Sequence, residues 1–154
     1  MKRIIQKYLQ GILGFENYLF VFSIFIISTL RFNRKERDFL HFLNLIPDNS
    51  TILDIGANIG IMTVHFARKL KKSNVFSIEP VPENVKALRR IIGFYKLKNV
   101  KVINIALGNR NGEVEMVLPI IQSVKMQGLS HVLHPDIKGF EDGQHFKATI
   151  KKLD

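Results

Sequence analysis

The chain has 154 residues, which is enough for one domain and no more. Its 46% hydrophobic content, with 12 Phe, excludes a disordered chain, and the absence of Cys excludes disulfides and thiolate chemistry. The net charge of +10 is uneven, because residues 51–110 carry 11 Lys and Arg against 3 Asp and Glu. Such a surface attracts RNA, anionic lipid or phosphorylated sugars, although solvated helix faces and helix C-terminal turns explain it more simply.

Two hydrophobic helices are predicted at the N-terminus. Residues 1–13 place apolar side chains on one helical face and basic or amide side chains on the other, as in a short amphipathic helix. Residues 18–30 are apolar on all sides, but thirteen residues are too few to span a bilayer comfortably. Arg31 follows in place of a small-residue cleavage site, which argues against a signal peptide. Membrane association of this region and packing of its helices on the domain remain two open interpretations.

The remainder of the chain alternates helices and strands, which is typical of a Rossmann-like α/β fold. Pro82 is placed to open a helix, and Asn111-Gly112 before a run of alternating apolar residues predicts a hairpin. The expected elements, in chain order, are a helix over 36–46, a strand over 51–55, a helix over about 58–70, a strand over 74–78, a helix over 82–95, strands over 100–107 and 114–118, and a strand from about 146 to 151.

The most informative motif is the turn that follows the strand over 51–55. It reads Asp54-Ile55-Gly56-Ala57-Asn58-Ile59-Gly60, and its small residues let the backbone approach a ligand. A lone carboxylate, Glu79, ends the next strand, where doubly wound folds bind the ribose of a nucleoside. The glycine spacing departs from Gly-x-Gly-x-x-Gly, so NAD and FAD fit poorly. Two glycines alone indicate only a tight turn, but together with Asp54 and Glu79 they predict a nucleoside cofactor.

The motif over residues 54–60 resembles motif I of class I S-adenosylmethionine-dependent methyltransferases, with Asn in place of the more usual middle glycine. With Glu-Pro-x-Pro-Glu-Asn at 79–84 and the segments 104–109 and 111–115, the chain resembles the FkbM family in particular. This resemblance implies S-adenosylmethionine as the cofactor and methyl transfer to an oxygen of a sugar or another small hydroxylated metabolite. The residues implied to face its amino acid part, ribose and adenine are, respectively, Asp54 with Gly56, Ala57, Asn58 and Gly60; Glu79; and Ala106.

The resemblance also implies that the sheet is incomplete. In FkbM-like proteins a fourth strand follows a segment that ends in Leu-Asp, and this chain ends at Leu153-Asp154. We therefore expect three parallel strands plus a hairpin, with the apolar strand over 51–55 left as an unpaired edge. Residues 1–34 are assigned to the hydrophobic helical region, and residues 35–154 to a truncated S-adenosylmethionine-binding domain. No catalytic base can be identified.

Two further functions remain open. One is a catalytically inactive, membrane-associated remnant, which the missing half of the sheet suggests. The other is an RNA methyltransferase, which the basic half suggests but which is disfavoured because the specific motif match points elsewhere. His131, His134 and Asp136 form a weak ligand set, so no metal is expected. The expected location is the cytoplasm, with the membrane as a partner if residues 1–30 attach to it.

Overall fold

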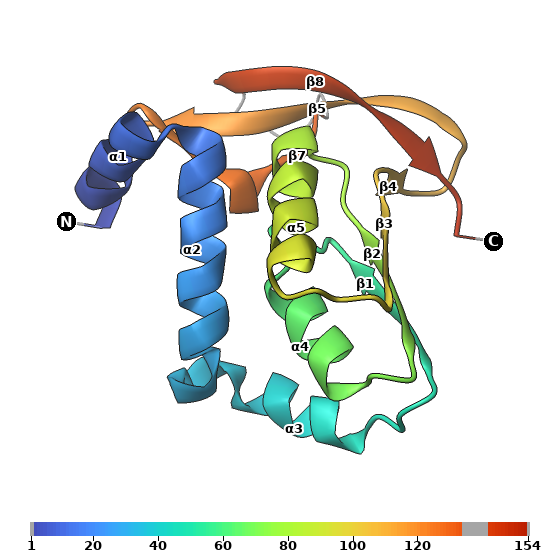
Figure 1. Cartoon of the computed structure of the whole chain (residues 1–154). Coiled ribbons are helices and arrows are strands. Elements are labelled where there is room, and N and C mark those ends of the chain that lie inside the picture. The colour runs from blue at the N-terminus through green and yellow to red at the C-terminus, as the bar shows by residue number, and fades with distance from the viewer. Residues whose placement is uncertain (1, 134–141, 154) are drawn as a thin grey trace.

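The chain folds into two β-sheets with helices packed beside them (Figure 1). The computed structural model describes residues 2–133 and 142–153. The helices are α1 (Lys2–Leu13), α2 (Phe15–Thr29), α3 (Arg37–Leu45), α4 (Ile61–Lys69) and α5 (Pro82–Phe94), with the short 3₁₀ turns η1 (Leu30–Phe32), η2 (Arg34–Glu36) and η3 (Gln127–Leu129). The strands are β1 (Thr51–Ile55), β2 (Asn74–Ile78), β3 (Val100–Ile103), β4 (Ala106–Leu107), β5 (Gly112–Ile121), β6 (Val124–Lys125), β7 (His131–Val132) and β8 (Gly143–Lys151).

The first sheet is parallel, with strand order β1-β2-β3, as the alternation of strands and helices predicts. The helix after β1 was expected from about residue 58, but α4 begins at Ile61. The reason is that Asn58 and Gly60 have left-handed backbones, with φ of 50° and 86°, which no α-helix accommodates. β1 pairs with β2 alone among the described strands, and the side chains of Leu53 and Ile55 are 48% and 57% exposed.

The second sheet differs from the sequence-based prediction. Residues 100–107 were expected to form one strand, but the chain bends at Asn104, so β4 leaves the first sheet and joins the second. The strand order is β4-β8-β5-β6, and β7 also pairs with β5. The turn at Asn111-Gly112 therefore joins two strands that are not neighbours. The hairpin lies instead at Gln122 and Ser123, whose φ angles of 52° and 63° suit the tight turn between β5 and β6.

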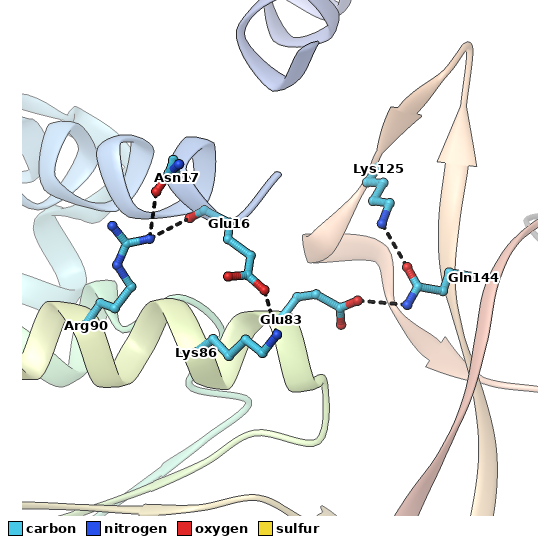
Figure 2. A network of polar contacts seen from close by, with 7 residues as sticks. All are labelled: Glu16, Asn17, Glu83, Lys86, Arg90, Lys125 and Gln144. Atoms are coloured by element: carbon cyan, nitrogen blue, oxygen red, sulfur yellow. Dashed lines mark hydrogen bonds and ion pairs between the residues drawn. The ribbon is translucent and has the colours of Figure 1, made fainter. Parts of the chain in front are cut away.

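The N-terminal helix α2 packs against α4 and α5. Its side chains Tyr18, Leu19, Ser23 and Ile27 are buried, and the Ser23 hydroxyl shares its proton between the carbonyl oxygens of Leu19 (2.7 Å) and Ile59 (3.2 Å). Polar contacts hold its first turn to α5, as Figure 2 shows: Lys86 Nζ lies 2.6 Å from Glu16 Oε1, and Arg90 donates to Asn17 at 3.0 Å.

The helical stretch Phe15–Phe32 is long and apolar enough to cross a membrane by length and composition, and 28% of it is buried inside the structure. A buried core helix meets the same two criteria. Length and hydropathy therefore do not decide between the two interpretations of this region.

Candidate cofactor site

The turn between β1 and α4 is held by hydrogen bonds to the end of β2. The backbone N–H groups of Gly56 and Ala57 both donate to the Ile78 carbonyl oxygen, at 2.9 and 3.0 Å. Gly60 lies close to α5, because a Cβ atom at this position would stand 2.6 Å from Leu88 Cδ1. A Cβ atom at Gly56 would meet no heavy atom within 4 Å. The two glycines therefore differ: Gly60 is required for packing, whereas Gly56 leaves open space beside the turn.

Glu79 lies beneath this turn and is only 4% exposed. Its carboxylate accepts hydrogen bonds from the backbone N–H groups of Asn58 (2.8 Å) and Val81 (3.0 Å), and from the side-chain amide of Asn84 (3.1 Å). Burial raises the pKa of Glu79, the three hydrogen bonds oppose this shift, and the charge of Asp54 adds to it. Oε2 accepts one of the three bonds and Oε1 two, so Oε2 retains capacity for a further donor.

Asp54 is held from the opposite side by α4. The Thr63 hydroxyl donates to Asp54 Oδ2 and lies 3.1 Å from the hydroxyl of Ser77 on β2. Thr63 and Ser77 are both fully buried. Burial raises the pKa of the Asp54 carboxyl, and the Thr63 hydrogen bond partly opposes that effect. The two carboxylates at the ends of β1 and β2 are thus both partly desolvated, and each is fixed by donors from the protein.

A cavity of about 270 Å³ opens beside the turn. This volume is near the lower end of the roughly 300–1,000 Å³ of typical ligand pockets. One wall consists of the turn and α4, and the other comes from α2, η1, η2 and η3. The lining residues are Phe22, Ile26, Thr29, Leu30, Asn33, Glu36, Asp54, Gly56, Ala57, Asn58, Ile59, Ile61, Met62 and Gln127. Within this turn, Asn58 Oδ1 is buried and has no hydrogen-bond donor.

The structure brings most of the predicted site residues together. Asp54, Gly56, Ala57 and Asn58 line the cavity, Gly60 stands at the start of α4, and Glu79 is bonded to the Asn58 backbone. Ala106 lies outside this lining, since it is buried in the second sheet among Met116, Ala148 and Ile150. The roles assigned to these residues toward a cofactor remain predictions.

Sequence reasoning missed several residues that hold the two carboxylates in place. Asn84, in the first turn of α5, donates its side-chain amide to Glu79. Thr63 and Ser77 belong to none of the motifs, although their hydroxyls connect Asp54 to β2. Asn104 donates to the carbonyl oxygens of Glu79 (2.8 Å) and Pro80 (3.0 Å). In the sequence, the only sign of these residues is a polar side chain at a position where the helix or strand pattern predicts burial.

The metal hypothesis was placed on His131, His134 and Asp136. His134 and Asp136 lie outside the described residues. Within residues 2–133 and 142–153, no group of three or more His, Cys, Asp or Glu side chains could hold a metal ion.

The fold is of the class I S-adenosylmethionine-dependent methyltransferase type, with parallel strands, a small-residue turn after β1 and an acid after β2. No family model matches the chain. It is 29% identical over 117 residues to Methyltransferase 1 of Beauveria bassiana (strain ARSEF 2860), which covers 70% of this chain and 47% of that protein.

Two other proteins also resemble parts of the chain, one over a shorter segment and one over a segment of similar length. It is 47% identical over 58 residues to the probable ribosomal RNA small subunit methyltransferase A of Methanosphaera stadtmanae (strain ATCC 43021 / DSM 3091 / JCM 11832 / MCB-3), which covers 38% of this chain and 21% of that protein. A putative caffeoyl-CoA O-methyltransferase from Staphylococcus aureus has a crystal structure similar to this one, with 24% identity and a TM-score of 0.43, over 69% of this chain and 51% of that one. The chain spans about half or less of the length of the relatives that it matches.

Proposed function

We propose that the chain supplies the cofactor-binding part of an S-adenosylmethionine-dependent O-methyltransferase of the FkbM type, acting on a sugar or another small hydroxylated metabolite. One observation carries this proposal. The carboxylates of Asp54 and Glu79 stand at the ends of neighbouring parallel strands, on either side of a left-handed turn that opens into a cavity. Class I methyltransferases use this arrangement to bind a nucleoside that carries a positively charged amino acid tail.

The residues present fit such a ligand. The ammonium and sulfonium groups of S-adenosylmethionine are positively charged, and the Asp54 carboxylate lines the cavity. The ammonium group is also a donor for Asn58 Oδ1, which has none in this structure. Glu79 Oε2 keeps a lone pair that could accept from a ribose hydroxyl, but Glu79 is only 4% exposed and lies outside the cavity lining, so this bond requires the carboxylate to become accessible. The cavity is smaller than the whole cofactor needs, and the open space at Gly56 extends it.

When bound, the cofactor supplies an electrophilic methyl group for in-line displacement by an acceptor oxygen. The chain's own task is to orient that group and to keep water away from it. Apolar side chains of α2 and α4 serve the second task, because Phe22 and Ile26 line one wall of the cavity and Met62 lines the other. Glu79 and Asp54 serve to orient the cofactor, because hydrogen bonds fix both carboxylates before any ligand binds.

Calorimetric titration of S-adenosylmethionine into the purified chain tests this proposal. We expect saturable binding that is lost in Glu79→Gln, which keeps the size of the side chain, and retained in Glu115→Gln, an exposed residue of β5. Binding that Glu79→Gln leaves unchanged would contradict the assignment of the site. Absence of binding by a folded chain would favour the catalytically inactive remnant.

A second candidate, RNA methylation, is favoured by one specific observation. A cavity of about 460 Å³ between the C-terminal ends of α4 and α5 is lined by Arg68, Lys71, Lys96 and Lys98. The two helix ends carry about half a negative charge each, so the four cations leave a net charge of roughly +3. Across the described part of the chain, none of the four forms an ion pair.

The name of the Methanosphaera stadtmanae relative points in the same direction. Binding of a labelled single-stranded RNA, measured at rising salt, distinguishes this candidate from the first. RNA methylation predicts affinity that falls steeply with salt and that the double variant Lys96→Glu, Lys98→Glu abolishes. The small-metabolite enzyme predicts weak RNA binding that is insensitive to these substitutions.

A further inference from the structure

The amphipathic helix α1 turns its glutamine side chains toward the protein and leaves most of its apolar face exposed to solvent. Within this helix, the least exposed side chains include those of Gln6 and Gln10. The apolar side chains are exposed, by 61% for Ile4, 68% for Tyr8 and 79% for Ile12, and Ile5 and Leu9 share the same face. A helix that packs on a soluble domain normally shows the opposite orientation, because burying its apolar face stabilises the packing.

Specific contacts fix this orientation. The side-chain amide of Gln10 donates to the Lys125 carbonyl oxygen and accepts from the Lys125 N–H, both at 3.1 Å. The Lys125 ammonium in turn lies 5.0 Å from the ring centroid of Phe15, where α2 begins. Two hydrogen bonds from Gln10 therefore hold α1 to β6, and rotating the helix to bury its apolar face would break both.

The exposed face of α1 continues into a groove formed with α2. This groove has a volume of about 650 Å³, and its lining is almost entirely apolar: Ile5, Gln6, Leu9, Leu13, Tyr18, Val21, Phe22, Phe25 and Ile26. Val21 and Phe25 remain 51% and 60% exposed. Both helices lie at one side of the molecule, with α1 at its outer edge (Figure 1). Seven of the seventeen large apolar side chains that are exposed in the described residues fall between positions 4 and 25.

The charge around this surface is strongly positive. Residues 2–35 contain six Lys and Arg and a single acid, Glu16, which is already paired with Lys86. Arg3 and Lys7 lie exposed on α1, and Arg31, Arg34 and Lys35 lie exposed just beyond the other end of α2. A second copy of the chain would bring like charges together, which opposes self-association through this face. An anionic surface is the complementary partner.

We propose that α1 and the exposed side of α2 form a docking surface for an anionic lipid bilayer. The α1 helix lies along the interface, with its apolar side chains among the acyl chains and its cations at the headgroups. Tyr8 suits this depth, since its ring is apolar and its hydroxyl is polar. In this arrangement α2 does not span the bilayer, because its buried Ser23 stays bonded to Ile59 and its inner face stays packed on α4 and α5. This inference does not depend on the proposed function.

Vesicle flotation tests the proposal with the full chain. Vesicles of phosphatidylcholine with about 30% phosphatidylserine should carry the chain upward, and vesicles of phosphatidylcholine alone should carry much less. Ile12→Glu should weaken binding at least tenfold, roughly the effect of withdrawing one aliphatic side chain from an apolar phase. Leu153→Glu is the matched control, because Leu153 is also an exposed apolar residue, at 62%, and it lies outside the surface.

The charge contribution is tested separately. Arg3→Glu combined with Lys7→Glu should weaken binding to the anionic vesicles by about tenfold or more and leave binding to neutral vesicles nearly unchanged. The equivalent pair Lys71→Glu and Lys72→Glu, outside the surface, is the control. Because the chain contains no Trp, an Ile12→Trp variant also reports directly: its emission should shift to shorter wavelength when anionic vesicles are added.

Three results would overturn the proposal. The first is failure of the folded chain, checked by circular dichroism, to float with anionic vesicles. The second is equal loss of binding in Ile12→Glu and Leu153→Glu. The third is a concentration-dependent dimer in analytical ultracentrifugation that Ile12→Glu dissolves, since a second copy would then cover this surface.

Discussion

Replacing Gly60 by Ala should destabilise the fold more than the same replacement at Gly56. Both glycines have left-handed backbones, with φ of 86° and 73°. They differ in their surroundings, because a Cβ atom at Gly60 would stand 2.6 Å from Leu88 Cδ1, whereas one at Gly56 would contact nothing within 4 Å. Leu88 is fully buried, so its side chain has little room to move aside.

The expected loss of stability has two causes, the left-handed backbone and the contact with Leu88. Placing an L-residue in the left-handed region costs about 1–2 kcal/mol, and this term applies to both variants. Overpacking a buried side chain costs a further 1–3 kcal/mol or so, and this term applies to Gly60→Ala alone. The free energy of unfolding should therefore fall by about 1–2 kcal/mol in Gly56→Ala and by about 2–5 kcal/mol in Gly60→Ala.

Urea denaturation followed by far-UV circular dichroism measures both values. The double variant Gly60→Ala, Leu88→Ala provides the decisive control, because removing the Leu88 methyl groups relieves the contact. Its destabilisation should be smaller than the sum of the two single values. Equal costs for the two glycines, or strict additivity in the double variant, would refute the reasoning.

Three further predictions concern residues near the site and the second sheet. Burial raises the pKa of Asp54, so the folded state holds this proton more tightly, and stability falls as pH rises from the unfolded value of 3.8 through the folded one. Asp54→Asn should therefore gain stability relative to the wild type between about pH 3.5 and pH 7, measured by urea denaturation at each pH. Gly143→Ala should destabilise the fold by about 3 kcal/mol or more, because its Cβ atom would stand 2.3 Å from the Leu118 carbonyl oxygen; thermal unfolding measures this. Ser23→Ala should cost about 1 kcal/mol in the same assay, since it leaves the buried Ile59 carbonyl without this donor.

Each of these predictions has a clear contrary result. A constant difference between Asp54→Asn and the wild type across the pH range would mean that Asp54 is not desolvated in the folded state. Wild-type stability in Gly143→Ala would mean that β5 and β8 are not in the observed register. Unchanged stability in Ser23→Ala would mean that the bond from Ser23 to Ile59 does not stabilise the packing of α2; Ser23→Cys, of similar size, is the control for packing.

The local features of the fold could be read from the sequence. The predicted strands over 51–55 and 74–78 coincide with β1 and β2, because short apolar runs bounded by turn residues favour parallel strands. The turn over residues 56–60 and the acid Glu79 could be placed as well, because each directly follows one of these strands. The burial of Glu79 could not, since its donors Val81 and Asn84 come into position only when residues 80–84 fold back over the carboxylate.

Long-range pairing was beyond the reach of local patterns. Nothing in the run over residues 100–107 signals that Asn104 bends the chain, because its hydrogen bonds go to Glu79 and Pro80, about 25 positions earlier. The insertion of β8 between β4 and β5 is likewise a tertiary choice. In α1, the sequence separates a polar from an apolar face, but only the contact of Gln10 with Lys125 decides which of the two meets the protein.

Strand β8 is synthesised after the other described strands, yet it lies between β4 and β5 in its sheet. The three described strands of the first sheet have all been synthesised by Ile103, and they can pair as they emerge from the ribosome. About 30 residues separate the end of β5 from the end of β8, which at roughly 5–20 residues per second takes a few seconds. During that interval the apolar segment Met116–Leu118 lacks its main partner strand. The nascent chain should therefore fold in two stages, and the pause between them is when it is most exposed to aggregation and most open to chaperones.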